Sequence, residues 1–243
     1  MDRRLHGRLP GRCATGFRNC NIPALLCAVA SHYLSKPPTQ ISPAYSRYPF
    51  VSLRFCTMRI YLIRHTTPSI PRGTCYGFTD LDLAPTFETE ASRLLPLLPT
   101  APLSVYASPL QRCHRLAQFL FPSATIALDH RLKELNFGDW EMQRWDNLGE
   151  NALQEWMTDY VHTRVPNGES YKDLYTRSIE SLLEIVAAGQ DSAIVTHGGV
   201  IRSILAYVMN TPLEKSFDTR VEWGRMARLD YDGHTFRVAG IDE

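Results

Sequence analysis

The chain has 243 residues, and its 26 basic and 25 acidic residues give a formal net charge of +1. This length suffices for one ordinary domain with a sizeable core. A near-neutral balance predicts neither a nucleic-acid partner nor a charged membrane surface as partner. No apolar stretch approaches the length needed to span a bilayer.

The basic residues concentrate at the start of the chain. Residues 1–57 carry eight Arg or Lys and one acid, Asp2, which leaves 18 basic and 24 acidic residues for 58–243. We therefore expect a basic N-terminal extension at 1–57, disordered or absent from the mature protein, and one domain at 58–243.

Three interpretations of this leader remain open. Its Arg-rich, acid-poor composition is typical of transit peptides. Its apolar stretch at 22–30 ends in Ala-Val-Ala, which resembles a signal cleavage site. The interpretation that we favour is that translation begins at Met58, directly before the first predicted strand.

The cysteines divide in the same way. Only Cys75 and Cys113 belong to the domain, too few for a disulfide framework, so we expect a reducing compartment, the cytoplasm. No set of His, Cys and Asp residues has a recognisable metal-ligand spacing. We therefore expect no metal and no other cofactor.

Strand and helix patterns alternate after Met58. The first half predicts, in chain order, a strand at 59–63, a loop rich in Pro, Gly, Thr and Asp at 70–83, a helix at 87–98, a strand at 103–106, a helix at 109–121 and a strand at 125–128. Pro109 opens the second of these helices, in the first turn, where proline is tolerated.

The second half continues the alternation. It predicts helices at 148–161, 170–188 and 199–209, a strand at 193–195, and a hairpin of 225–230 with 235–241. Ser170 and Asp173 form a capping-box pattern, and Asp232-Gly233 marks the hairpin turn. Strands that alternate with helices favour a mainly parallel sheet covered on both faces, a three-layer α/β/α sandwich.

Polar residues follow three of the predicted strands. Arg64-His65 follows the first, Ser108 the second, with Arg112 in the next helix, and His197 the strand at 193–195. The carboxyl ends of parallel strands meet at one edge of a sheet, so these side chains should share one crevice. Arginine clamps phosphate, and the glycine pair after His197 leaves backbone N–H groups for an anion. The pattern predicts a phosphate-handling site.

Five motifs occur in order between residue 58 and about residue 205. They are Arg64-His65, Ser-Pro-Leu-Gln-Arg at 108–112, Leu-Lys-Glu with Phe-Gly-Asp-Trp-Glu at 132–141, Pro-Asn-Gly-Glu-Ser at 166–170, and Val-Thr-His-Gly-Gly at 195–199. Together they resemble the motifs of the histidine phosphatase superfamily, the phosphoglycerate-mutase-like clan. The resemblance implies a phosphoglycerate-mutase-like α/β fold and a metal-independent phosphomonoesterase that acts on small molecules.

The resemblance also implies roles for single residues. His65 would take the phosphoryl group, and Arg64, Arg112, His197 and Gly198 would bind its oxygens. Glu134 would protonate the leaving oxygen and later activate water. Three other carboxylates remain open as the acid: Glu141, Asp139 and Asp80.

The chain departs from the family pattern at three places. Thr66 replaces a usual glycine, Thr67-Pro68 replaces a Glu-Thr and Asn pattern, and Met142 replaces a glycine. The loop at 73–83 instead resembles the Cys-Tyr-Gly-x-Thr-Asp loop of alpha-ribazole phosphatases, which act in cobalamin nucleotide-loop assembly. On this resemblance we expect Tyr76 and Thr79 to bind substrate, although Tyr76 could equally pack under the loop.

Other functions are compatible with the same motifs. The alternatives are a phosphoglycerate mutase, a broad-specificity sugar phosphatase and a non-catalytic phosphate-binding module. The short domain disfavours the mutase, and the intact His65, Glu134 and His197 disfavour the binding module. The oligomeric state stays open.

Overall fold

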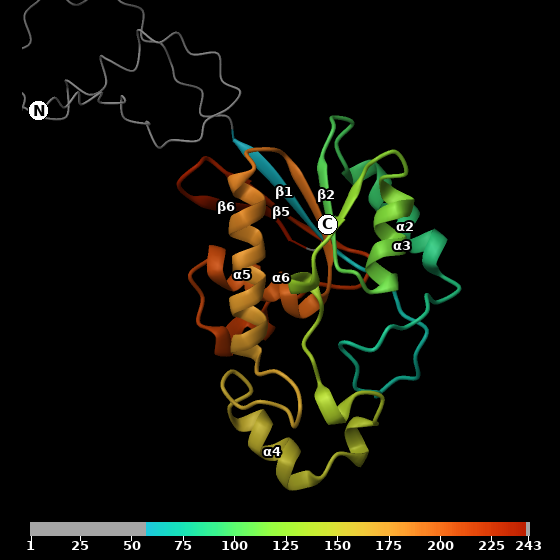
Figure 1. The fold of residues 1–243 in the computed structure, drawn as a ribbon, viewed down its shortest axis with the longest axis vertical. Coiled ribbons are helices and arrows are strands. Elements are labelled where there is room, and N and C mark those ends of the chain that lie inside the picture. The colour runs from blue at the N-terminus through green and yellow to red at the C-terminus, as the bar shows by residue number, and fades with distance from the viewer. Residues whose placement is uncertain (1–56, 242–243) are drawn as a thin grey trace, which may run out of the picture. The chain divides into compact units, whose positions relative to one another are not determined.

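The computed structural model describes residues 57–241, and Figure 1 shows the arrangement of their elements. Apart from Thr57, the predicted N-terminal extension lies outside the described residues. The described strands form one six-stranded sheet in the order β3-β2-β4-β1-β5-β6. The strands are β1 (Met58–Arg64), β2 (Ser104–Ala107), β3 (Ile126–Leu128), β4 (Ser192–Thr196), β5 (Met226–Tyr231) and β6 (Phe236–Gly240).

Strands β1 to β4 are parallel to one another, and β5 runs antiparallel to both of its neighbours, β1 and β6. β1 and β2 both pair in parallel with β4, and β3 pairs in parallel with β2. β5 pairs antiparallel with β1 and with β6. Gly233, in the turn between β5 and β6, has a φ of +95°, which glycine adopts without strain. The mainly parallel sheet and the terminal hairpin are therefore confirmed.

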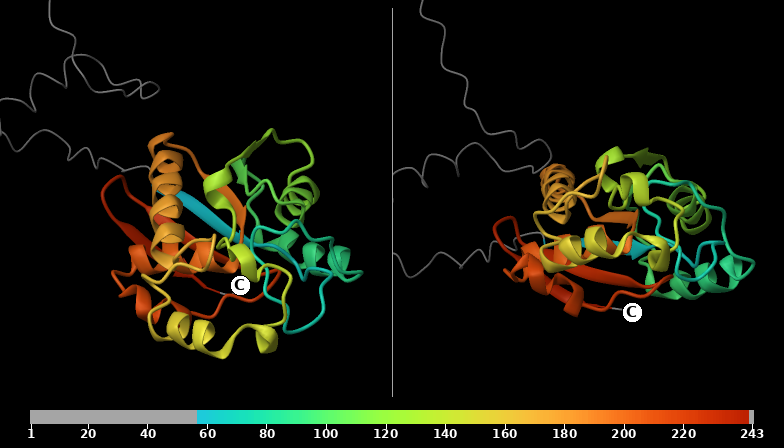
Figure 2. Two further views of the ribbon diagram at one scale, coloured as in Figure 1. Left: turned by 60° about the horizontal axis from the view of Figure 1, so that its bottom comes forward. Right: turned by 90° about the horizontal axis from the view of Figure 1, so that it is seen from below.

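Helices cover both faces of the sheet. Ile60 and Leu62 of β1 pack with α5 (Tyr171–Ala187) and α6 (Gly198–Val208), whereas Tyr61 and Ile63 pack with α2 (Phe87–Leu94) and α3 (Gln111–Leu120). This alternation follows from the two-residue period of a strand. Figures 1 and 2 show the strands between the two helix pairs. The predicted three-layer α/β sandwich is confirmed.

Helix α5 begins where the capping-box pattern predicts. The Ser170 hydroxyl accepts a hydrogen bond from the backbone N–H of Asp173, and Oδ2 of Asp173 accepts one from the backbone N–H of Ser170. These bonds satisfy two donors that the first turn of a helix leaves free.

Two helix boundaries differ from the prediction at prolines. Helix α3 begins at Gln111, so Pro109 lies before the helix and not in its first turn. Oδ1 of Asp80, from the preceding loop, accepts the backbone N–H of Gln111 at 2.7 Å and thereby caps the helix. Helix α2 ends at Leu94, and Pro96 lies in a 3-10 turn at Leu95–Leu97 because it has no N–H to continue the helix.

A cap lies beyond the carboxyl ends of the parallel strands. It contains α4 (Glu150–Thr158), shorter than the predicted helix at 148–161. Trp156 of α4 packs against Trp140, Trp145 and Phe137 with ring centroids 5.8 to 6.2 Å apart. Within residues 57–241, no helix is both long and apolar enough to cross a membrane.

Candidate active site

Two histidines lie side by side at the carboxyl edge of the sheet. His65 follows β1 and His197 follows β4, and the parallel register pairs Arg64 with Thr196, so both histidines leave the sheet at one level. Their ring centroids are 5.1 Å apart. His65 is 1% exposed and His197 is fully buried. The strand order therefore brings the two rings together at this edge of the sheet, where both are buried.

One hydrogen bond fixes the tautomer of His65. Its Nδ1 lies 2.7 Å from the carbonyl oxygen of Thr66. A carbonyl only accepts, so Nδ1 donates its proton and Nε2 keeps a free lone pair. Burial, followed by the charges of Arg112 and Arg64, holds the pKa of His65 well below its ordinary value. A neutral imidazole with a free Nε2 is the form that attacks phosphorus.

His197 is neutral for similar reasons. Burial, then Arg112 and then His65, lower its pKa well below the ordinary value. Its Nε2 lies 2.8 Å from the hydroxyl of Ser108 and 3.4 Å from the sulfur of Cys113. The Ser-Pro motif thus supplies a side chain that orients the second histidine.

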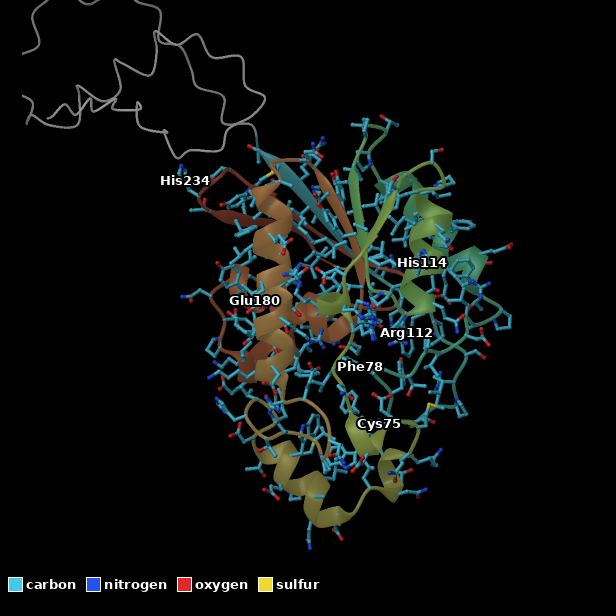
Figure 3. The ribbon with its side chains drawn as sticks, viewed as in Figure 1. Cys75, Phe78, Arg112, His114, Glu180 and His234 are labelled. Carbon is cyan, nitrogen blue, oxygen red and sulfur yellow. The ribbon has the colours of Figure 1, made fainter. Side chains whose placement is uncertain are left out.

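Arg112 is the second residue of α3 and is completely buried. Its Nη1 donates to the carbonyl of Thr79 at 2.8 Å, its Nη2 donates to the carbonyl of Gly77 at 2.6 Å, and its Nε has no partner among the described residues. Figure 3 shows Arg112 in the middle of the molecule, with Phe78 and Cys75 following toward α4. Carbonyls orient this guanidinium without neutralising it, so it keeps a full charge for an anion.

Arg64, the last residue of β1, is held in the same manner. Its Nη1 donates to the carbonyl of Val221 at 2.6 Å, and its buried Nε finds no partner in the described part of the chain. The charges of Arg112 and Arg64 both contribute to the lowered pKa of His65. Binding of a phosphate by these two arginines stays a prediction.

Glu134 comes from the loop before the cap. Its Oε2 accepts the backbone N–H of Gly199, in the first turn of α6, at 3.2 Å, and its Oε1 accepts the N–H of Leu135 at 3.1 Å. Glu134 lines a cavity of about 190 Å³ together with Arg64 and Tyr76. Glu134 and Arg64 therefore line the same cavity.

Arg177 of α5 holds the backbone around Glu134. It donates to the carbonyls of Arg131, Lys133 and Glu134 at 2.6 to 2.7 Å, and its Nη2 pairs with Glu169 at 2.8 Å. This guanidinium is mostly buried, so its bonds are screened little by water. Arg177 therefore fixes the position of the loop and not the carboxylate itself.

Glu141 differs from Glu134 because it binds the backbone of the loop at 77–79. Its carboxylate accepts the backbone N–H groups of Gly77, Phe78, Thr79 and Phe137, together with the Thr79 hydroxyl. Burial alone would raise the pKa of Glu141, but the Thr79 hydroxyl and these N–H groups outweigh it and lower the pKa. A carboxylate held in its ionised form is a poor proton donor.

The other two open carboxylates also have structural partners. Asp80 caps α3 through Gln111, and Oδ2 of Asp139 accepts the side-chain amide of Asn167 at 2.9 Å. Among the four carboxylates that the sequence left open, Glu134 is the one that lines the cavity beside Arg64.

Comparison with known proteins decides the family. Residues 60–243 match the family model described as histidine phosphatase superfamily (branch 1). The chain belongs to the histidine phosphatase superfamily. It is similar to the adenosylcobalamin/alpha-ribazole phosphatase of Salmonella typhimurium, with 30% identity over 184 residues that cover 71% of this chain and 90% of the relative.

Solved structures agree with this assignment. The alpha-ribazole phosphatase from Shigella flexneri has a TM-score of 0.71 and 25% identity, and covers 76% of this histidine phosphatase and 96% of its own chain. YhfR from Bacillus stearothermophilus has a TM-score of 0.69 and 27% identity, with coverage of 75% and 95%. The chain is therefore a phosphatase with the phosphoglycerate-mutase-like fold.

Tyr76 and Thr79, the predicted substrate contacts of this histidine phosphatase, lie in different surroundings. Tyr76 lines the cavity, and the guanidinium of Arg112 lies 5.6 Å from its ring centroid. The hydroxyl and N–H of Thr79 donate to Glu141, and its carbonyl accepts a hydrogen bond from Arg112. The structure thus gives Thr79 an orienting contact with Arg112, and substrate binding by either residue stays a prediction.

The sequence did not identify Arg202 or Trp223 as site residues. Arg202 lines the cavity, and the guanidinium of Arg64 lies 5.1 Å from the ring centroid of Trp223. Arg202 follows Gly198 by four residues, the spacing at which two residues share a helix face, and this was the available signal. No comparable local signal connects Trp223 with Arg64.

The positive charge of the site comes from side chains. Within residues 57–241, no cluster of three or more His, Cys, Asp or Glu residues is arranged to hold a metal ion. Whether this histidine phosphatase acts without a metal stays a prediction.

Proposed function

We propose that this histidine phosphatase hydrolyses small phosphate monoesters through a phosphohistidine formed on His65. The observation that carries the proposal is the bond from Nδ1 of His65 to the Thr66 carbonyl, which leaves Nε2 as the nucleophile. Burial and two guanidinium groups keep this imidazole neutral, and the same guanidinium groups attract the phosphate dianion.

In the first step, Nε2 of His65 attacks phosphorus and the bond from phosphorus to the ester oxygen breaks. Glu134, in its protonated form, gives its proton to the departing oxygen, so the alcohol leaves neutral. Arg64, Arg112 and His197 stabilise the charge on the phosphoryl oxygens during transfer. The products of this step are the alcohol and phosphohistidine.

In the second step, a water molecule attacks the phosphohistidine. Glu134 is now a carboxylate and takes a proton from the water, while the P–N bond breaks and its electron pair returns to Nε2 of His65. Inorganic phosphate leaves, and His65 and protonated Glu134 are restored. One carboxyl group therefore serves as acid and then as base.

We propose alpha-ribazole 5′-phosphate as the first substrate to examine. Support comes from the loop at 73–83 and from the similarity to alpha-ribazole phosphatases. A panel with this nucleotide, sugar phosphates and glycerate phosphates separates it from the two alternatives within the fold. Transfer of the phosphoryl group to a second glycerate phosphate would indicate a mutase, and equal rates on many sugar phosphates would indicate a broad-specificity phosphatase.

Rapid quenching with a ³²P-labelled substrate tests the proposed intermediate. The wild-type protein should carry a label that is labile in acid and stable in base, as expected for a phosphoramidate, and His65→Ala should carry none. Label on a serine, cysteine or aspartate would overturn the assignment of His65.

A further inference from the structure

Arg202 presents a second positive charge to the cavity. It lies on α6, and its Nε donates to the carbonyl of Thr219 at 3.1 Å. Its guanidinium lies 5.2 Å from the ring centroid of Phe217, which is 51% exposed. One carbonyl and one aromatic ring therefore orient this side chain, and its terminal nitrogens keep their charge.

Arg64 is oriented by the same segment of chain. Its carbonyl partner is Val221, and the ring beneath it is Trp223, which is 41% exposed. Alternate residues of the segment 217–223 thus hold the two arginines. Phe217 and Thr219 supply a ring and a carbonyl to Arg202, and Val221 and Trp223 supply a carbonyl and a ring to Arg64. We call this stretch the arginine-holding segment.

The two guanidinium groups both lie close to the α-carbon of Gly198. A Cβ atom at this position would lie 3.0 Å from Nη1 of Arg202 and 3.0 Å from Cζ of Arg64. Side chains of a helix point back toward its N-terminus, so Arg202 reaches the first turn of α6, four residues before it. The missing side chain of Gly198 lets both cations approach the same point.

The pair has no carboxylate in direct contact among the described residues, where no Asp or Glu forms a salt bridge with Arg202 or Arg64. Burial lowers the pKa of Arg64, Glu134 opposes this, Arg202 lowers it further, and Glu222 raises it to a smaller extent. A hydrogen bond from Arg220 lowers the pKa of Glu222 most. Arg64 and Arg202 lower that pKa further, so this carboxylate offsets part of their charge. Two crowded like charges without a salt bridge are stabilised when an anion binds between them.

The two cations come from different elements. Arg64 ends β1 and directly precedes His65, whereas Arg202 lies on α6. Both line the cavity whose wall also contains Glu134, the proposed proton donor. In the proposed mechanism the alcohol part of the substrate lies beside Glu134, so Arg202 would face this part of the substrate.

We propose that Arg202, together with Arg64, binds a second oxyanion in the alcohol part of the substrate. The preferred substrates are then phosphate monoesters whose alcohol carries a carboxylate, phosphodiester or second phosphate close to the scissile ester. An ester of a neutral alcohol still binds through the phosphoryl group, but with lower affinity. This inference rests on the proposed function, because it takes the scissile phosphoryl group to lie between His65 and Arg112.

Phosphonates test this subsite by binding alone. Phosphonoacetate and 3-phosphonopropionate carry a carboxylate, whereas ethylphosphonate and propylphosphonate keep the phosphonate group and have a methyl group in place of the carboxylate. Calorimetric titration of the wild-type protein should show at least one acid binding about tenfold to a hundredfold more tightly than its counterpart, the range for a hydrogen-bonded charged pair. Arg202→Gln should reduce this ratio to near one, and Arg202→Lys should retain part of it.

Arg115→Gln is the matched control. Arg115 is an exposed arginine on α3 that pairs with Asp82, and its loss should leave the ratio unchanged. Melting temperatures of the variants show whether each one is folded. Equal affinity for both members of each pair in the wild type, or an unchanged ratio in a folded Arg202→Gln protein, would overturn the inference. The binding measurement does not need turnover and is independent of the trapping experiment. The subsite can therefore be refuted while the phosphohistidine is trapped, and it can be supported when no phosphohistidine is found.

Discussion

The backbone N–H of Gly199 donates to Oε2 of Glu134 at 3.2 Å, and a Cβ atom at position 199 would lie only 2.3 Å from Oε1 of the same carboxylate. Real Cβ contacts are never this short. An alanine at this position could be accommodated only if the Glu134 carboxylate and the Leu174 side chain, 2.9 Å from the same Cβ, moved away. The family's second glycine has a steric explanation here in addition to its exposed N–H group.

Gly199→Ala should displace Glu134. A catalytic group moved by about 1 Å loses roughly a hundredfold in rate, so hydrolysis of an alkyl phosphate should fall by about this factor. Steady-state kinetics measures the loss. Gly149→Ala is the control, because a Cβ at Gly149 meets nothing within 4 Å. An unchanged rate in Gly199→Ala would show that the position of Glu134 does not matter.

Glu134→Gln should discriminate between leaving groups. An alkoxide must be protonated as it leaves, whereas nitrophenolate leaves unaided. Positioned acid catalysis contributes about a hundred- to ten-thousand-fold, so alkyl phosphates should slow by about that factor and nitrophenyl phosphate much less. Glu141→Gln removes loop contacts and should slow both substrates alike. If Glu134→Gln also slowed both equally, Glu134 would not be the acid.

Activity should survive exhaustive chelation with EDTA. Arg64, Arg112 and His197 stabilise the charge on the phosphoryl oxygens in the proposed mechanism, so no metal is needed to stabilise transfer. Vanadate should inhibit, because it mimics five-coordinate phosphorus. A strict dependence on added magnesium or zinc in the same assay would contradict this prediction.

Stability should fall on acidification because of His65. Its folded pKa lies well below its ordinary value of 6.5, so below pH 6.5 the unfolded chain binds a proton that the folded protein excludes. This contribution is therefore complete above pH 6.5 and is lost as the pH falls below it. Below pH 6.5, the free energy of unfolding measured with urea should depend on pH with a slope that is smaller in His65→Asn than in the wild type by up to about 1.4 kcal/mol per pH unit, and above it the two slopes should agree.

A matched histidine controls this measurement. His130 is exposed, and His130→Asn should reproduce the wild-type slope. Equal slopes in wild type and His65→Asn would mean that His65 takes up a proton in the folded protein at moderate pH.

A chain that begins at Met58 should fold and retain activity. All six described strands lie within 58–240, and Met58 itself pairs with Tyr231 in β5. Melting temperature and turnover of nitrophenyl phosphate should match those of the full chain. An insoluble or inactive shorter chain would show that residues 1–57 contribute to the domain.

Local signals account for most of the fold. The buried strand β4 contains the short apolar run at 193–195, and the Ser170 cap and the Asp232-Gly233 turn depend on neighbours in sequence. The histidines and arginines of the site were predictable for a related reason. Both histidines follow a strand directly, Arg64 is the last residue of β1, and Arg112 lies in the helix after β2. The topology of a parallel sheet brings these strand ends together.

Contacts between distant segments could not be predicted. Glu141 and Glu134 both look like loop carboxylates in the sequence. Glu141 differs because it accepts the N–H groups of residues 77–79, which lie more than 60 positions earlier, and so holds that loop in place. The cap of α3 by Asp80 likewise comes from another loop, so the sequence placed the helix start too early at Pro109. Such partners depend on tertiary structure and leave no periodic pattern.

Glu141 also shapes how the protein can diversify. It anchors the loop through Gly77 and Thr79, the two residues whose carbonyls orient Arg112. Tyr76, directly before this anchor, lines the cavity and contacts the guanidinium of Arg112 with its ring. The carbonyl bonds to Arg112 come from the anchored residues and do not depend on the side chains at 69–75. Exchanging residues 69–75 between family members, with Tyr76 kept, is therefore a direct way to vary substrate preference while Arg112 keeps its carbonyl partners.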